Sequence, residues 1–188
     1  MLAPTAAVAE LITAIEPWDD REKAHIAQTL TWLASTDDIH RRIPPATPSP
    51  HLVVYTVLVD PGAESIFLGR HLKSGLDLPM GGHVDPGEHP LTAARREARE
   101  ELNLTADFDV VGAAPFFLTV TPVLLPAPHT DITLWHVIRG DRATPYPLDP
   151  GEFSSGRWHP FTPVPDSDPH LPRFLAKLTH ALTNRSRA

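Results

Sequence analysis

The stretch "PMGGHVDPGEHPLTAARREAREELNL", residues 79–104, decides the fold because it joins a glycine-rich turn to a highly charged helix. Gly87 follows a proline in a turn signal and tolerates a positive φ. Pro90 suits the first turn of a helix, where its missing N–H has no helical partner. Apolar residues then recur at helical spacing: Leu91, Ala94, Ala98 and Leu102. The pattern predicts a helix over residues 90–102, which ends at Asn103 because asparagine tolerates the left-handed conformation.

The predicted helix concentrates negative charge on one side. Glu97, Glu100 and Glu101 fall within an arc of about 100°, and Arg96 stands one turn before Glu100 and can pair with it. Like charges at this spacing destabilise a helix by a few tenths of a kcal/mol per pair. A solvated charged face is the usual fate of such a helix. Three carboxylates beside a Gly-Gly turn are, however, also the oxygen ligands that a magnesium ion needs.

Composition narrows the classes of protein. The chain has 188 residues, which suits one domain with a small appendage, and its net charge is −7. That charge argues against a general binder of nucleic acid or of a membrane surface. The absence of cysteine excludes disulfides, thiolate nucleophiles and cysteine-based zinc sites. We find neither a long apolar run nor a signal-peptide pattern, so we expect a cytoplasmic protein.

The remaining pattern predicts helices at both ends of a strand-rich region. Residues 5–35 should form a helical hairpin, with Asp19 or Asp20 capping its second helix. The expected inward-facing residues of the hairpin are Val8, Leu11, Ile12, Ile15, Ala24, Ile26, Leu30 and Leu33. The proline-rich stretch 42–50 should be a linker. Strands are expected at 51–60, 66–72, 108–112, 115–125, 131–140 and 156–161. A final helix at 168–184 should bury Leu171, Phe174, Leu175, Leu178 and Leu182. This order predicts an α+β fold or a three-layer α/β/α fold.

The charged segment resembles the Nudix box, Gly-x5-Glu-x7-Arg-Glu-U-x-Glu-Glu-x-Gly-U, in which U is a bulky aliphatic residue. The match runs from Gly82 to Leu104, with Asn103 in place of the usual glycine and the small Ala98 at the first U. The chain is thereby identified as similar to the Nudix hydrolase superfamily. The resemblance implies a mixed sheet between helices for residues 50–188, the Nudix hydrolase domain. Residues 1–45 would add an N-terminal helical hairpin.

The resemblance also implies an activity. Nudix hydrolases cleave a nucleoside diphosphate linked to another moiety, by attack of water on phosphorus with the help of Mg²⁺ or Mn²⁺. By position, the implied metal ligands are the carbonyl of Gly81 and the carboxylates of Glu97, Glu100 and Glu101. Glu100 and Glu101 are also implied as catalytic residues. Arg96 should orient the glutamates, and Glu88 should brace the loop against the helix.

Further site residues are expected outside the box. Some Nudix enzymes bring a glutamate from a loop that precedes a late tryptophan, and "EFSSGRW" has that form. Glu152 is therefore the predicted general base, and Asp149 is its main rival. Arg70 is expected to contact phosphate. Phe117 and Trp135 are the predicted platform for a nucleobase, chosen from the strand residues Phe116, Phe117, Trp135, His136 and Trp158, although aromatic residues in strands are more often core. The 11 histidines are scattered, without a paired ligand motif, and we expect most of them at the surface. His83 is the exception because it lies inside the box loop.

The substrate class follows only by elimination. The prolines after the box, Pro115 and Pro122, do not stand where ADP-ribose enzymes tend to place one, and the markers of dinucleoside polyphosphate, coenzyme A and NADH enzymes are missing. A small phosphorylated nucleotide, either a nucleoside triphosphate or a modified nucleotide, is the expected partner of a monomer or homodimer. No nucleic acid or membrane partner is expected.

Three other functions stay open at this point. The chain could be a Nudix-like nucleotide-binding or regulatory module without turnover, although its box carboxylates are complete. It could belong to the isopentenyl diphosphate isomerase branch of the fold, but that chemistry depends on a cysteine that this chain lacks. Residues 1–45 could also serve as a helical interaction module.

Overall fold

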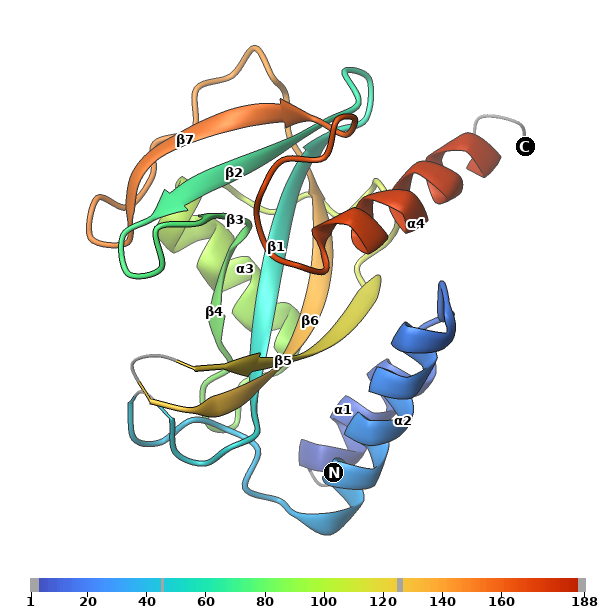
Figure 1. Ribbon diagram of the computed structural model, residues 1–188. Coiled ribbons are helices and arrows are strands. Elements are labelled where there is room, and N and C mark those ends of the chain that lie inside the picture. Colours follow the sequence, from blue (N-terminus) through green and yellow to red (C-terminus); the bar gives the residue numbers. More distant parts are fainter. Residues whose placement is uncertain (1–3, 45, 125–126, 186–188) are drawn as a thin grey trace. The chain divides into compact units, whose positions relative to one another are not determined.

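The computed structural model describes residues 4–44, 46–124 and 127–185. Within these residues the chain forms four helices and seven strands, and the strands join in one sheet (Figure 1). The helices are α1 (Pro4–Thr13), α2 (Asp20–Ser35), α3 (Pro90–Leu102) and α4 (Leu171–Arg185). The strands are β1 (His51–Asp60), β2 (Ser65–His71), β3 (Asp77–Leu78), β4 (Met80–His83), β5 (Phe117–Val123), β6 (His129–Arg139) and β7 (Phe153–Pro160). The α+β class predicted from the sequence is confirmed.

The sheet has the strand order β3-β2-β1-β6-β5, with β4 paired to β1 and β7 paired to β2. The predicted hairpin of β1 and β2 is antiparallel, with Val59 opposite Ile66. Of the predicted segments, residues 1–3 and 45 of the N-terminal region and Leu125 of the strand at 115–125 lie outside the described residues.

The structure divides into two compact units, which we describe separately. The first unit comprises Met1–Tyr55, Gly82–Ala94 and Ala114–His136, and the second comprises Thr56–Gly81, Arg95–Ala113 and Val137–Ala188. Strands β1, β4 and β6 and helix α3 contribute residues to both units.

Helix α2 of the first unit shields the edge strand β5. Asp19 caps the helix by accepting a hydrogen bond from the Glu22 N–H. The Glu22 carboxylate has no exposed surface and accepts the N–H of Leu118 on β5 at 3.2 Å, while His25 Nδ1 accepts the N–H of Val120 at 3.3 Å. An edge strand presents unpaired N–H groups that favour aggregation unless they are covered. The helix therefore stands where another strand could otherwise pair.

This contact corrects the predicted inward face of α2. Of the four residues expected to face inward on this helix, only Leu33 is buried, and Glu22 and Thr29 are buried instead. The predicted stripe followed hydrophobicity alone, whereas the helix turns its hydrogen-bond acceptors toward the strand. For the first part of the hairpin the prediction holds for Val8 and Ile12 on α1 and for Ile15 just after it, which are buried, and not fully for Leu11, which is half-buried.

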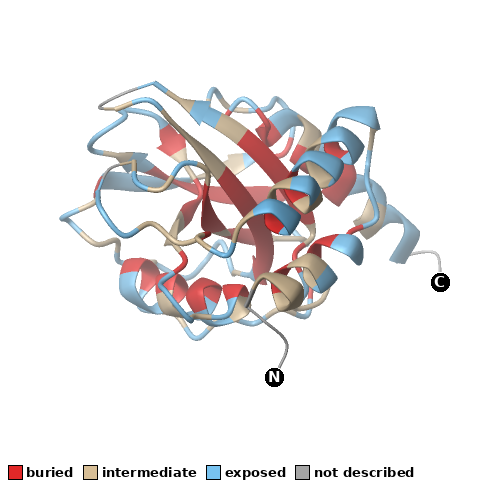
Figure 2. Cartoon of the chain, turned by 90° about the horizontal axis from the view of Figure 1, so that it is seen from below, coloured by how far each residue is buried: buried red, intermediate tan, exposed pale blue. Residues whose placement is uncertain are grey.

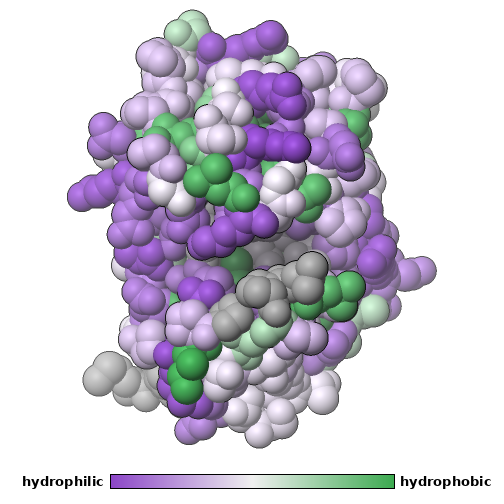
Figure 3. Space-filling model, turned by 60° about the vertical axis from the view of Figure 1, so that its left-hand side comes forward, coloured by the Kyte–Doolittle hydropathy of each residue, from purple (hydrophilic) through white to green (hydrophobic). Residues whose placement is uncertain are grey.

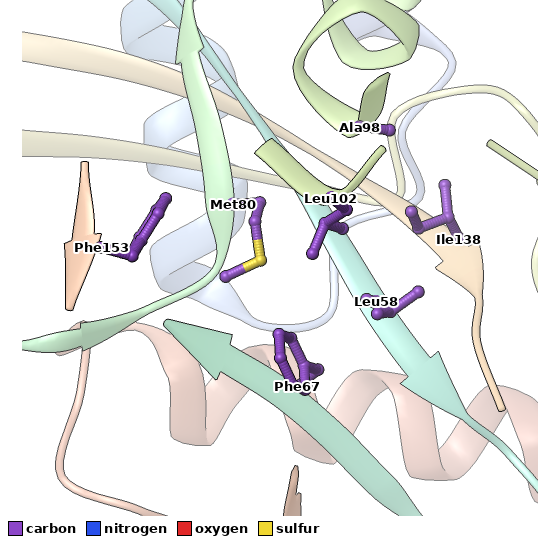
Figure 4. Close-up of a cluster of buried hydrophobic side chains, with 7 residues drawn as sticks. All are labelled: Leu58, Phe67, Met80, Ala98, Leu102, Ile138 and Phe153. Atoms are coloured by element: carbon purple, nitrogen blue, oxygen red, sulfur yellow. The ribbon is translucent and has the colours of Figure 1, made fainter. Parts of the chain in front are cut away.

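The core of the second unit fixes the strands and helix that carry the charged residues. Its members lie on β1, β2, β4, α3, β6 and β7, and Figure 4 shows their side chains: Leu58, Phe67, Met80, Ala98, Leu102, Ile138 and Phe153. Phe153 packs over Gly69, where an added Cβ would lie 2.4 Å from the ring. Only glycine permits this approach, so Gly69 helps to place the start of β7.

Helix α3 spans the predicted residues, and its C-terminal end has the predicted conformation. Asn103 has a φ of 49°, in the left-handed region. The Leu104 N–H then bonds to the Ala98 carbonyl at 3.1 Å. Asn103 thus takes the position that a glycine occupies in the Nudix box.

Buried residues concentrate in the strands, and the helices bury one face (Figure 2). Helix α4 buries Leu171, Phe174, Leu175 and Leu178 as predicted, whereas Leu182 is half-buried. The strand expected at 108–112 is absent from the described chain, which forms a turn there. Within this segment the Gly112 N–H donates to the Phe108 carbonyl at 3.0 Å.

Candidate active site

Two of the three clustered glutamates of α3 are buried. Glu97 and Glu101 are 6% and 4% exposed, whereas the Glu100 side chain is 56% exposed. Residues four apart in a helix lie on the same face. The second unit therefore buries two neighbouring carboxylates, which is costly unless they find protons, hydrogen bonds or a cation.

The Glu101 carboxylate lies beside the main chain of Gly81. Its Oε2 accepts the Gly81 N–H at 2.7 Å. Burial raises the pKa of Glu101 to about 9, the charge of Glu97 adds to the rise, and the Gly81 hydrogen bond partly opposes it. Glu152 and Asp149 also raise the pKa of Glu101 through their charges. The structure thus brings Gly81, Glu97 and Glu101 together, as their predicted shared role requires.

Arg96 joins the glutamates on its side of the helix. Its Nη1 lies 2.6 Å from Glu97 Oε1 and 3.1 Å from Glu100 Oε2. The predicted pairing of Arg96 with Glu100 is confirmed. Burial raises the pKa of Glu97 above its ordinary value, and Arg96 opposes that rise while Glu100 and Glu152 add to it.

The loop that precedes β7 approaches these carboxylates. The Asp149 N–H donates to the Glu101 carbonyl at 3.2 Å, which attaches the loop to the end of α3. Asp149 Oδ1 accepts the Gly151 N–H at 2.8 Å within the turn. Glu152 is next to the buried Phe153, and its carbonyl accepts the Leu72 N–H at 2.8 Å. Both predicted candidates for the general base therefore stand near the glutamates, and Asp149 already has one carboxylate oxygen engaged in the turn.

This donor set suits a hard divalent cation. Glu97 and Glu101 offer carboxylate oxygens, the ligand type that Mg²⁺ and Mn²⁺ prefer. Burial raises the pKa of both carboxylates, and the charge of Glu97 raises the pKa of Glu101 further. A cation would therefore relieve both the desolvation and the repulsion. The residues fit the metal that the Nudix box implies.

Arg70 belongs to a charged group on β2, β3 and β7. The buried Asp77 receives a hydrogen bond from Arg157 Nη2 at 2.7 Å, and Arg70 Nη1 lies 3.5 Å from its other oxygen. The two arginine side chains are 52% and 68% exposed, so both can still meet an anionic ligand. Figure 3 brings this side of the sheet forward, and hydrophilic side chains cover most of that face. Sequence reasoning named Arg70 but missed Asp77 and Arg157, which only strand pairing brings together.

We expect Asp77→Asn to lower the free energy of unfolding by about 1 kcal/mol at neutral pH, a modest effect because the arginines are exposed. Burial alone would raise the pKa of Asp77, but the hydrogen bond and charge of Arg157, with the charges of Arg70 and His159, lower it below 3.8. The stabilisation is therefore present above the unfolded-state pKa and is lost as pH falls through the lowered folded-state pKa.

Urea unfolding at neutral pH and in acid measures this difference. The exposed Asp37 supplies the control Asp37→Asn, which should match the wild type at both pH values. A deficit for Asp77→Asn that persists unchanged in acid would contradict the ionic interpretation.

The predicted base platform is part of the core. Phe117 and Trp135 have no exposed surface, stand opposite each other on β5 and β6, and pack edge to face at 5.6 Å. Rings without an exposed face cannot stack on a ligand in this conformation. Of the other aromatic candidates, Phe116 and Trp158 are half-buried and His136 is buried.

A side chain within the turn at the start of the box stabilises that turn. Gly87 has a φ of 81°, as the turn signal predicted. Glu88 Oε2 accepts the Asp85 N–H at 3.1 Å. Glu88 therefore braces the turn itself, within the first unit.

Comparisons with known proteins point to one family and one fold. A family model described as the NUDIX domain matches residues 49–180. A NUDIX-family hydrolase from Clostridium perfringens has 22% identity and a TM-score of 0.52, over 71% of this chain and 97% of its own. A MutT NUDIX hydrolase from Burkholderia pseudomallei has 17% identity and a TM-score of 0.51, over 68% of this chain and 95% of its own. No curated protein matches. At these identities the two solved structures show likeness of fold, and they confirm the predicted fold class.

Proposed function

The chain belongs to the NUDIX domain family, whose members hydrolyse nucleoside diphosphate derivatives, and on that premise we propose that it is a metal-dependent diphosphatase. The observation that supports this proposal most strongly is the pair of buried carboxylates, Glu97 and Glu101, beside the main chain of Gly81. Burial of two neighbouring carboxylates costs stability unless a cation offsets it, so the pair supports a metal site.

The proposed roles follow from the contacts. Glu97 and Glu101 hold the metal with the Gly81 carbonyl, and the exposed Glu100 completes the ligand set or orients water. A bound Mg²⁺ or Mn²⁺ supplies neutralisation of the diphosphate charge and activation of water. Arg96 fixes the carboxylates of Glu97 and Glu100 through its hydrogen bonds.

In the proposed reaction a water molecule attacks a phosphorus atom of the diphosphate. The water oxygen forms the new bond to phosphorus, the bond to the bridging oxygen breaks, and Glu152 accepts the proton that the water loses. Most of the catalysis in phosphoryl chemistry comes from positioning and charge stabilisation. Arg70 is proposed to contact phosphate, because its guanidinium remains half-exposed beside Asp77.

The proposed substrate is a nucleoside triphosphate or a modified nucleotide. A panel of nucleotides and nucleotide sugars, assayed for released phosphate or diphosphate, tests the activity and the substrate together. We expect turnover of at least one member with Mg²⁺, none in excess chelator, and recovery when Mg²⁺ is restored. Nucleotide binding without turnover under all these conditions would support the alternative, a catalytically silent Nudix-like module.

We also propose residues 50–188 as the catalytic domain, acting in the cytoplasm as a monomer or homodimer. Light scattering on the full chain measures the oligomeric state. None of the described helices combines the length and apolar character that a membrane crossing needs.

Addition of Mg²⁺ or Mn²⁺ is expected to raise the melting temperature of chelator-treated protein. A ligand bound only by the native state stabilises it by about 2.7 kcal/mol at 100 times its dissociation constant, and the buried glutamates make the metal-free protein the less stable form. Thermal denaturation followed by circular dichroism measures the shift. NaCl at matched ionic strength is the control, and equal shifts with both salts would show screening instead of binding.

A further inference from the structure

Strands β1, β4 and β6 bring three histidines and an aspartate together in the first unit. His51 begins β1, His83 ends β4, and His129 and Asp131 stand two residues apart on β6. His51 Nε2 lies 3.0 Å from Asp131 Oδ1 and 3.1 Å from His83 Nε2. His129 Nε2 lies 3.4 Å from the same aspartate oxygen. We name these four residues the histidine cluster.

The expectation that most histidines lie at the surface does not hold for His51 and His129. His51 has no exposed surface and the His129 side chain is 7% exposed. The signal in the sequence was the spacing of His129 and Asp131, because residues two apart in a strand point to the same face.

Hydrogen bonds to the backbone fix two of the imidazole rings. His51 Nδ1 lies 2.6 Å from the Pro48 carbonyl, and His129 Nδ1 lies 2.7 Å from the Ala127 carbonyl. A carbonyl oxygen only accepts, so each Nδ1 carries a proton and each Nε2 faces the cluster. Histidines that bind metals are oriented in this way, with the second ring nitrogen donating to a carbonyl or carboxylate.

The centre of the cluster holds an unsatisfied acceptor. Asp131 Oδ1 is buried and accepts no hydrogen bond of good geometry from the described residues, although two ring nitrogens face it. An unsatisfied buried carboxylate oxygen carries a large desolvation cost. With the ring proton on Nδ1, the neutral His51 ring presents a lone pair at Nε2 and has no proton there for Asp131 or His83. A cation between His51, His129 and Asp131 would satisfy this carboxylate oxygen and both Nε2 atoms at once.

We propose that His51, His129 and Asp131 bind a divalent transition-metal ion, in particular zinc, because one ligand atom of each lies within 4.8 Å of the other two. Four ligands at about 2.0–2.1 Å in a tetrahedron lie about 3.3 Å from one another. The separations of Asp131 Oδ1 from His51 Nε2 and from His129 Nε2, 3.0 and 3.4 Å, bracket that value. The protein supplies three ligands, and the fourth position of the tetrahedron is open to water.

The ligand types separate this site from the glutamates of α3. Imidazole nitrogen favours zinc, whereas magnesium prefers carboxylate and water oxygens. The positive charge of Arg41 acts on His83 and disfavours a cation bound by charge alone. Direct bonds from nitrogen to the metal must outweigh that repulsion, which again favours zinc over magnesium.

Zinc titration of the chelator-treated full chain against a chromophoric competitor tests the proposal. We expect one tight zinc ion per chain, not displaced by excess Mg²⁺, and a rise in melting temperature on binding. Asp131→Asn keeps the shape of the side chain, and His51→Gln keeps a polar group in its place. Each should weaken zinc binding by about a hundredfold, since even residues that only orient a ligand contribute 10- to 100-fold.

Two matched variants locate the ion. His180→Gln changes an exposed histidine of α4, and Glu101→Gln changes the proposed magnesium site. Both should bind zinc as the wild type does, and Co²⁺ in its place should give the intense visible absorption of a four-coordinate nitrogen and oxygen site. The proposal is overturned if the wild type binds no stoichiometric zinc. It is equally overturned if zinc binding survives Asp131→Asn and His51→Gln but falls with Glu101→Gln.

Discussion

Glu101→Gln is expected to lower kcat at least about a hundredfold and to weaken metal binding. The carboxylate is buried beside Glu97 and held by the Gly81 N–H. Loss of a charged metal ligand removes several kcal/mol of charge stabilisation in the transition state, and about 2.7 kcal/mol already corresponds to a hundredfold change in rate. Glutamine keeps the shape and an oxygen acceptor for Gly81, so the fold should be preserved.

The melting temperature separates a catalytic effect from a folding effect. In metal-free protein at neutral pH, the raised pKa of about 9 keeps Glu101 largely protonated, and a neutral carboxylic acid resembles an amide. The variant should therefore match the wild type in chelator and lose the stabilisation that Mg²⁺ provides. Glu10→Gln, at an exposed position of α1, is the control. Wild-type turnover of Glu101→Gln at low Mg²⁺ would remove Glu101 from the metal site.

Glu152→Gln is expected to lower kcat by 10²–10⁴-fold, the range of a positioned general base. Glu152 acts electrostatically on both Glu97 and Glu101 and follows the turn that attaches to the end of α3. The next residue, the buried Phe153, packs over Gly69 and so fixes the backbone position of Glu152. KM and melting temperature should change little, because the side chain is not part of the core.

Asp149→Asn is the matched comparison for this assignment. Asp149 also acts on Glu101, but one of its carboxylate oxygens accepts the Gly151 N–H. An asparagine can still accept that hydrogen bond, so the turn should survive while the charge is lost. If Asp149→Asn abolishes turnover while Glu152→Gln stays within about threefold of the wild type, the role of base passes to Asp149. If both variants keep wild-type rates, neither residue is the base.

Features that depend on neighbouring residues in the sequence could be predicted well. The bounds of α3, the turn at Gly87 and the left-handed Asn103 each follow from residues within a few positions. The buried state of Glu97 and Glu101 could not be derived from helical periodicity, because it depends on which strands cover that face. The Nudix resemblance implied that these glutamates bind metal, but it did not predict their burial.

Features that depend on strand pairing were missed. Glu22 belongs to a polar helix face by pattern, and only the position of β5 explains why it is buried. Asp77 and Arg157 are 80 positions apart and meet because β3 and β7 both pair with β2. The histidine cluster likewise depends on three strands that are distant in sequence, and its only local signal was the spacing of His129 and Asp131.

Binding of Mn²⁺, followed by the loss of the electron paramagnetic resonance signal of the free ion, tests most directly whether the buried glutamates of α3 form the catalytic metal site. Wild type and Asp131→Asn should bind Mn²⁺ with the same affinity, because the histidine cluster is not the site of the catalytic ion. Glu101→Gln should bind Mn²⁺ far more weakly, in parallel with its loss of turnover. Equal Mn²⁺ affinity in wild type and Glu101→Gln, or a loss confined to Asp131→Asn, would contradict the assignment of Glu97 and Glu101 as the catalytic metal ligands.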